Sequence, residues 1–88
     1  DASVVHYWRT ANGAEVDLVI EQAGGMALAV ECKWKEHPDS TDAAGLRALE
    51  AVEKDRIKEK FIVCRTKAVY KLADGTWVMN MTQFLERK

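Results

Sequence analysis

Two carboxylates and one amine stand at a spacing that suits phosphodiester chemistry. Asp17 is followed fourteen positions later by Glu31 and sixteen positions later by Lys33. Carboxylate oxygens are the ligands that Mg²⁺ prefers in proteins, and an ammonium group offsets negative charge that develops on a phosphoryl group. The three side chains therefore supply the parts of a divalent-metal phosphodiesterase site, provided that the fold brings them together.

The segments that carry these residues are predicted to be β-strands, because residues 15–20 and 27–34 alternate their side chains with a period of two. Polar groups then gather on one face and apolar groups on the other. The predicted polar face comprises Glu15, Asp17 and Val19 of the first run and Ala27, Ala29, Glu31, Lys33 and Lys35 of the second. The predicted apolar face comprises Val16, Leu18 and Ile20, with Leu28, Val30, Cys32 and Trp34.

The segment EQAGGM between the two strands predicts a β-hairpin. A two-residue loop at positions 24–25 would set Leu18 beside Glu31, an apolar side chain next to a charged one on the same face. A three-residue loop at positions 23–25, with a glycine in the left-handed conformation, avoids this conflict. We therefore expect the register that opposes Asp17 to Glu31 and Glu15 to Lys33.

Opposed carboxylates repel each other, since directly paired residues have Cβ atoms roughly 4.5–5.5 Å apart. A metal ion would remove the repulsion. Without one, a shared proton or a raised carboxyl pKa is expected, and such pairs concentrate at functional sites. The competing interpretation is that Asp17, Glu31 and Lys33 belong to the solvated outer face of an antiparallel sheet. Spacing alone does not decide between the two.

The order of these motifs resembles the PD-(D/E)xK nuclease superfamily, in which an acidic residue on one strand precedes Glu/Asp-x-Lys on the next. More narrowly, HYWRTANGAEVD at residues 6–17, followed by VECK at residues 30–33, resembles the C-terminal domain of prokaryotic AAA-type ATP-binding proteins. Similar segments in that family correspond to Gly45–Arg47, Gly75–Val78 and Phe84–Leu85. The resemblance covers nearly the whole chain.

The resemblance implies a metal site and a catalytic lysine. Asp17 and Glu31 would bind Mg²⁺ or Mn²⁺, and the backbone carbonyl of Cys32 would add another ligand. Lys33 would position water or stabilise the transition state. We expect Glu15 to orient Lys33 or to join the metal shell.

The predicted fold is α/β, a restriction-endonuclease-like core with a mixed sheet of about five strands in the order β-β-β-α-β-β-α. Turn residues at 37–42 precede apolar residues at helical spacing, which predicts a helix of about four turns and then a strand at Phe61–Arg65. A strand–helix–strand connection predicts a parallel pair. Asp74-Gly75 predicts a second hairpin, and Thr82 is expected to start a short terminal helix.

Two features depart from the superfamily. Val16 stands where the superfamily name has proline, and the chain enters a predicted strand at residues 4–8 without the usual first helix, which often supplies a further acid. We expect one sheet face to lack a cover for this reason. Exposed apolar surface and strand edges then predict a homodimer or strand exchange.

Composition sets the remaining limits. The 88 residues, 48% of them hydrophobic, are enough for one small domain over residues 1–88, which we expect to be a C-terminal piece of a larger protein. The net charge of −1 provides no global field for nucleic acid, so binding would depend on local patches. Cys32 and Cys64 lack zinc spacing and are expected to be buried thiols in a reducing cytoplasm. No secretion signal or membrane-spanning run is found in the sequence.

Most other candidate residues are expected to have structural roles. His6 is expected on the surface or in strand pairing, and His37 in an exposed loop. The three tryptophans are expected in the core or at an interface rather than stacked on bases. Acids interspersed among the remaining cations predict a solvated surface, with Lys35 placed beside Lys33 as the exception. These cations are Lys35, Arg47, Lys58, Lys60, Arg65, Lys67 and Lys71.

Two functions remain open from the sequence. The first is metal-dependent phosphodiester hydrolysis, with DNA as the expected substrate, in a domain attached to an ATPase. The alternative is a catalytically inactive module with the same fold, used for docking to the ATPase portion, to another copy or to another protein. An ATPase activity of this chain is not supported, because the sequence has no Gly-rich phosphate loop followed by Lys-Ser/Thr.

Overall fold

The observed elements follow the hydrophobic pattern of the chain. A computed structural model describes residues 4–87. Its strands are β1 (Val4–Arg9), β2 (Glu15–Glu21), β3 (Ala27–Cys32), β4 (Ile57–Cys64), β5 (Tyr70–Lys71) and β6 (Trp77–Asn80). Its α-helices are α1 (Ala44–Glu53) and α2 (Met81–Glu86), and short 3-10 turns lie at Ala23–Gly25, Ser40–Ala43 and Lys54–Arg56.

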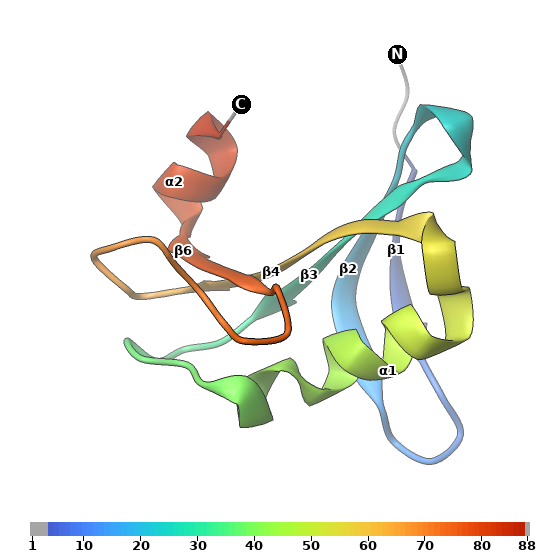
Figure 1. The fold of residues 1–88 in the computed structure, drawn as a ribbon, viewed down its shortest axis with the longest axis horizontal. Coiled ribbons are helices and arrows are strands. Elements are labelled where there is room, and N and C mark those ends of the chain that lie inside the picture. Colours follow the sequence, from blue (N-terminus) through green and yellow to red (C-terminus); the bar gives the residue numbers. More distant parts are fainter. Residues whose placement is uncertain (1–3, 88) are drawn as a thin grey trace.

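The strands form a six-stranded mixed sheet in the order β1-β2-β3-β4-β6-β5 (Figure 1). The first three strands are antiparallel neighbours, β3, β4 and β6 run parallel, and β5 is antiparallel to β6. Because α1 connects β3 to β4, the predicted parallel crossover is confirmed. The hairpin predicted at Asp74-Gly75 is confirmed by the antiparallel pair β5 and β6. With both of its strands following β4, the observed order has one strand more than the β-β-β-α-β-β-α prediction.

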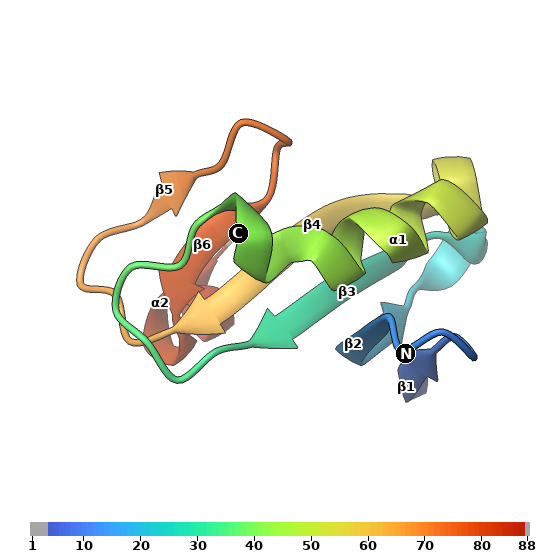
Figure 2. The same cartoon turned by 90° about the horizontal axis from the view of Figure 1, so that it is seen from below.

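Each face of the sheet carries its own apolar cluster and its own helix (Figures 1 and 2). On one face, Leu46 and Leu49 of α1 pack on small side chains such as Ala29. On the other face, Phe84 of α2 meets Phe61 edge to face, with ring centres 5.1 Å apart. The expectation of a bare face is therefore wrong for the part of the sheet under α2.

A β-bulge in β2 changes the predicted faces next to Asp17. The register of β1 with β2 shifts by one residue, so that Asp17 and Leu18 together lie opposite Tyr7. Val16 and Val19, on either side of the bulge, consequently share the face under α1, where both are buried. The predicted alternation, which set these two valines on opposite faces, is wrong.

Side-chain caps decide where the helices begin. Asp39 accepts a hydrogen bond from the Thr41 amide, and Asp42 accepts one from the Asp39 amide, so the polar residues at 37–42 start the helical segment as predicted. The terminal helix starts at Met81 rather than at Thr82, because Asn80 is the residue that caps it. The strand expected at Phe61–Arg65 begins four residues earlier, at Ile57.

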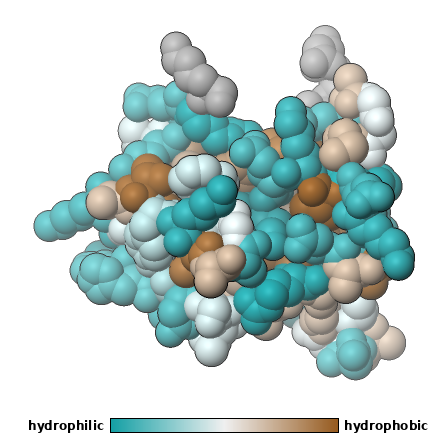
Figure 3. Space-filling model, in the orientation of Figure 1, coloured by the Kyte–Doolittle hydropathy of each residue, from teal (hydrophilic) through white to brown (hydrophobic). Residues whose placement is uncertain are grey.

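The surface of the described residues is mostly polar, with apolar side chains in separate patches on the visible face (Figure 3). Cys64 is buried, as expected, whereas Cys32 is exposed and corrects the prediction that both thiols are buried. Both cysteines are free. Neither helix within residues 4–87 is long and apolar enough to cross a membrane.

Candidate functional site

β2 and β3 lie side by side near their hairpin and separate toward its open end (Figure 1). The hairpin closes with a hydrogen bond from the Gln22 amide to the Met26 carbonyl oxygen, 2.8 Å long, across a loop in which both glycines have positive φ. The backbone ladder then continues as far as the pair Leu18–Val30. The next positions in this register are Asp17 and Glu31, so the predicted opposition of the two acids is confirmed.

Side chains replace the backbone ladder beyond that last pair. The Asp17 amide donates to Oε1 of Glu31 at 3.1 Å, and the Cys32 amide donates to Oδ2 of Asp17 at 2.8 Å. Each carboxylate therefore bonds to the backbone of the opposite strand. We call Asp17 and Glu31 the fork pair, because they bridge the two strands where these separate.

Lys33 is the cation of the fork pair. Its Nζ lies 3.3 Å from Oε2 of Glu31, whose side chain is 12% exposed. Burial and the neighbouring charge of Asp17 raise the pKa of the Glu31 carboxyl above its ordinary value, while the Asp17 amide and Lys33 oppose the rise only in part. The site thus has two acids and one amine, which pairs with Glu31, and it holds an excess of negative charge.

The remaining predicted site residues lie around the fork pair in different ways. The Cys32 amide already contacts Asp17, whereas its side chain is exposed. Glu15 is also exposed and lies opposite Arg9 in the backbone register of β1 with β2. Within residues 4–87, the ion pair of Lys33 is with Glu31, and Glu15 forms none with it. The expected opposition of Glu15 to Lys33 does not produce a contact.

Gly45 explains how α1 can lie so close to the fork pair. A Cβ atom at this position would overlap the carbonyl oxygen of Glu15, two residues before Asp17. The helix therefore touches the backbone of β2 directly, which only glycine permits. The GLR segment at residues 45–47 marks this close approach in the sequence, but its spacing alone does not reveal what the glycine faces.

Lys35 and His6 have partners outside the fork pair. Both carboxylate oxygens of Asp42 lie 3.1 Å from Nζ of Lys35, so this lysine is paired outside the fork pair, and its predicted place beside Lys33 stays a prediction. His6 pairs with Glu21 at 2.8 Å on the exposed edge of the sheet, which confirms its role in strand pairing. Neither residue contributes to the candidate site.

Lys60 was expected on the solvated surface but is buried, with a side chain only 6% exposed. Its Nζ donates to Oε1 of Glu50 and to the carbonyl oxygen of Asp74, both at 2.9 Å. Arg47 also reaches Asp74, at 3.3 Å. This cluster joins α1, β4 and the last turn, and charge patterning along the sequence gave no signal of it because its members are far apart in the chain.

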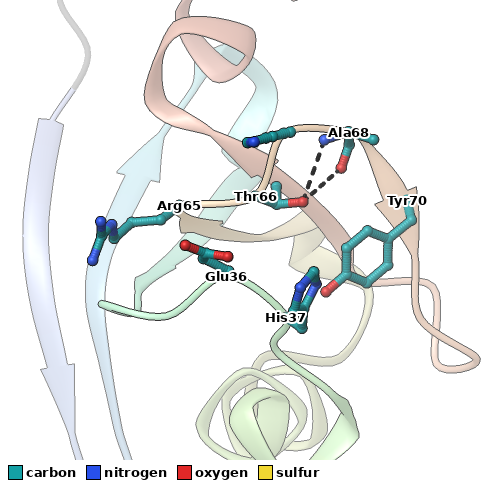
Figure 4. Close-up of a pocket in the computed structure, with 7 residues that line it drawn as sticks. Glu36, His37, Arg65, Thr66, Ala68 and Tyr70 are labelled. Carbon is teal, nitrogen blue, oxygen red and sulfur yellow. Dashed lines mark hydrogen bonds between the residues drawn. The ribbon is translucent and has the colours of Figure 1, made fainter.

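The loops at the ends of β3 and β4 form an open hollow of about 390 Å³ (Figure 4). The Tyr70 hydroxyl donates to the carbonyl oxygen of Pro38 at 2.7 Å and lies beside His37, which is exposed as predicted. Arg65 points away from both, and Trp34, next along the β3 loop, is 88% exposed. Trp34 therefore lies outside the core, and for this tryptophan the interface alternative of the prediction stays a prediction.

The residues of the fork pair suit a hard divalent cation. Carboxylate and carbonyl oxygens are the preferred ligands of Mg²⁺, and burial together with the charge of Asp17 raises the pKa of Glu31, a penalty on its carboxylate form that a cation would relieve. Within the described residues, no group of three or more His, Cys, Asp and Glu side chains comes together. A metal here would thus depend on two carboxylates, backbone oxygen and water.

Comparison with known families assigns the chain to one of them. A family model described as "Domain of unknown function (DUF4143)" matches residues 1–84, and the chain belongs to this family. No match was found among curated proteins or among solved structures.

Proposed function

We propose that this domain hydrolyses phosphodiester bonds with the help of a divalent metal, with DNA as the substrate. The observation that carries the proposal is the fork pair, in which two opposed carboxylates bridge the strands and only Glu31 pairs with an amine, that of Lys33. Such a charge excess in a partly buried position destabilises the folded chain when no cation is bound. Unusual carboxyl pKa values also concentrate at functional sites. The order Asp17, Glu31, Lys33 along two adjacent strands supports a restriction-endonuclease-like core.

Each residue of the site has a role in this proposal. Asp17 and Glu31 hold Mg²⁺ or Mn²⁺, with the carbonyl oxygen of Cys32 as a further ligand. The bound cation supplies Lewis-acid polarisation of the phosphoryl oxygens and lowers the pKa of water. Lys33 offsets the negative charge that develops on those oxygens, or orients the attacking water. Glu15 remains a candidate for orienting Lys33 as the strands adjust.

The setting of the domain is part of the proposal. Domains of this family are known in AAA-ATPase-associated proteins, which supports attachment to an ATPase portion that would act in the cytoplasm. The apolar residues exposed on β1, Val4, Val5 and Tyr7, lie on the edge strand of the sheet, which supports a homodimer or a strand-exchanged oligomer.

A non-catalytic module is the second candidate, and the fork pair also supplies the observation that favours it. Both carboxylates satisfy backbone amides that the diverging strands leave unpaired. Carboxylates used only in this way would hold β2 to β3 without binding metal. The domain would then serve for docking to the ATPase portion or for oligomerisation.

Thermal unfolding with and without Mg²⁺ or Mn²⁺ separates the two candidates. The amides in Asp17→Asn and Glu31→Gln keep an oxygen for the backbone bond but lose the charge. Under the nuclease proposal, metal at 100 times its Kd stabilises the wild type by about 2.7 kcal/mol, and neither variant responds. Glu86→Gln, on the exposed surface of α2, is the matched control and keeps the full response.

Cleavage of labelled DNA completes the test. Lys33→Met is expected to retain metal-dependent stabilisation while its Mg²⁺-dependent cleavage falls roughly 10²–10³-fold, the range for loss of a transition-state donor. Wild-type stability that does not respond to metal, together with no DNA cleavage, would leave the non-catalytic module as the function. Cleavage that survives both Asp17→Asn and Lys33→Met would show that the fork pair does not carry it.

A further inference from the structure

We propose that the substrate is engaged as a single strand, with Trp34 as a stacking platform for an unpaired base beside Lys33. This inference rests on the proposed function, whose substrate class it narrows. Trp34 follows Lys33 directly and is 88% exposed, the most exposed of the large hydrophobic side chains within residues 4–87. An exposed indole offers a large, flat apolar surface next to the lysine of the proposed site, which suits stacking of a base.

The backbone that carries the indole is anchored on both sides. The Lys33 amide donates to the carbonyl oxygen of Val63 at 3.0 Å, and the Arg65 amide donates to the carbonyl oxygen of Lys35 at 2.9 Å. The segment therefore continues beside β4 after the ladder ends. Trp34 thus lies on a segment fixed by backbone hydrogen bonds on both sides, and such a fixed backbone favours binding because little order has to be gained.

Arg65 lies against the ring, with its guanidinium carbon 5.4 Å from the ring centre. Below Trp34 lies a hollow of about 270 Å³, lined by Cys32, Lys33, Trp34, Val63, Cys64 and Met81. Cys32 and Lys33 connect this hollow to the fork pair. A base stacked on the indole would consequently lie next to Lys33, the cation that pairs with Glu31.

The larger hollow of Figure 4 continues the same edge of the sheet, because its lining takes the next residues of both loops. Arg65 and Lys67 lie there, and neither pairs with an acid among the described residues, although Glu36 is also in the lining. Free cations along an aromatic platform are the arrangement with which proteins hold the backbone of a single strand.

An unpaired strand fits these observations better than a duplex does. Stacking on Trp34 needs a base whose face is free, and in a duplex both faces are covered by neighbouring bases. The net charge of −1 provides no broad field for duplex DNA, so affinity must come from this local combination of stacking and cations. The same chemistry suits single-stranded DNA and single-stranded RNA.

Fluorescence anisotropy of labelled oligonucleotides tests the inference in the absence of metal, where no cleavage occurs. The probes are dT and rU strands of about 12 nucleotides and a DNA duplex of equal length. We expect a single strand to bind more tightly than the duplex, Trp34→Ala to weaken it roughly tenfold, and Trp34→Phe to retain most of the affinity. The ratio of dT to rU affinity identifies the sugar.

Two cation variants extend the test. Arg65→Ala is expected to weaken binding and to reduce the slope of log affinity against log salt by about 0.7, the value for one phosphate contact on a single strand. Lys58→Ala, exposed on the other part of β4, is the matched control and leaves both affinity and slope unchanged. Unchanged melting temperatures establish that the exposed substitutions leave the fold intact.

The outcomes separate this inference from the proposed function. Equal affinity for duplex and single strand, no effect of Trp34→Ala, or no binding overturns the single-strand inference. Loss of self-association in Trp34→Ala without loss of oligonucleotide binding also overturns it, since the indole would then be a protein contact. Trp34-dependent binding without Mg²⁺-dependent cleavage overturns the proposed hydrolysis alone, and cleavage that ignores Trp34 overturns this inference alone.

Discussion

Two clusters of acids and cations among the described residues differ in which charge is buried. Around Lys60, the cation is buried and its acids lie nearer the solvent: the side chain of Lys60 is 6% exposed, against 45% for Glu50 and 19% for Asp74. At the fork pair the order is reversed, with Glu31 at 12% and Lys33 at 34%. One cluster encloses a positive charge, and the other encloses negative charge.

The carboxyl pKa values separate the two clusters in the same way. Burial raises the pKa of Asp74, but hydrogen bonds from Thr76 and Arg47 outweigh it, so that the pKa lies below its ordinary value. Burial and Asp17 raise the pKa of Glu31, and Lys33 does not compensate. A balanced cluster stabilises the fold, whereas an unbalanced one keeps a demand for a cation. The direction of the carboxyl pKa shift therefore distinguishes a stabilising cluster from a candidate cation site better than the presence of an ion pair does.

The largest effect is expected at the balanced cluster. Lys60→Met leaves Glu50 and the Asp74 carbonyl without their donor; because Glu50 is 45% exposed, the loss is expected at about 2 kcal/mol, the cost of leaving a partly buried acceptor unpaired. Chemical denaturation measures the loss, with the exposed neighbour Lys58→Met as control. Metal-dependent stabilisation should persist in Lys60→Met. A smaller loss of unfolding free energy in Lys60→Met than in Lys58→Met would show that the Lys60 cluster does not stabilise the fold.

An intermediate effect is expected at the contact of α1 with β2. Gly45→Ala drives a methyl group into the Glu15 carbonyl, and the strain of overpacking, about 1–3 kcal/mol, exceeds the gain in helix propensity of about 1 kcal/mol. The shift of β2 next to Asp17 should also weaken the response to Mg²⁺, which Lys60→Met should not do. Thermal unfolding at several metal concentrations compares the two variants. Equal responses would mean that α1 does not position the fork pair.

The smallest effect concerns the charge of Glu31 itself. Because the folded chain has a raised Glu31 pKa, it holds this proton more tightly than the unfolded chain, and stability declines as pH rises from about 4.5 through the folded pKa. Glu31→Gln cannot ionise and should stabilise the metal-free chain at pH 7 by about 0.5 kcal/mol, the size of a like-charge pair across strands. The gain should vanish near pH 4.

Urea denaturation across pH 4–8 measures this difference, and Glu36→Gln, which alters an exposed acid, provides the baseline. A gain in Glu31→Gln that stays constant with pH would mean that the amide improves packing rather than removing charge. A loss at pH 7 would assign Glu31 to the stabilising kind of cluster, together with Asp74.

The local pattern around the fork pair was predictable, since the two glycines and the alternation beside them allow only one register without mixing polar and apolar faces. The parallel crossover through α1 followed from element order. The bulge at Asp17 was not predictable, because β2 keeps its alternation in sequence and loses it only through its pairing with β1. Burial of Lys60 depends on partners ten and fourteen residues away, which no local pattern reports.

The fork also provides the molecule with two spectroscopic reporters. The amide protons of Asp17 and Cys32 are held by carboxylates, not by carbonyl groups of a ladder. Any cation that binds those carboxylates changes the electron density around both amide protons. In a proton–nitrogen correlation spectrum of the unmodified chain, these two amide signals would therefore register occupation of the site directly, without substrate, turnover or an attached probe.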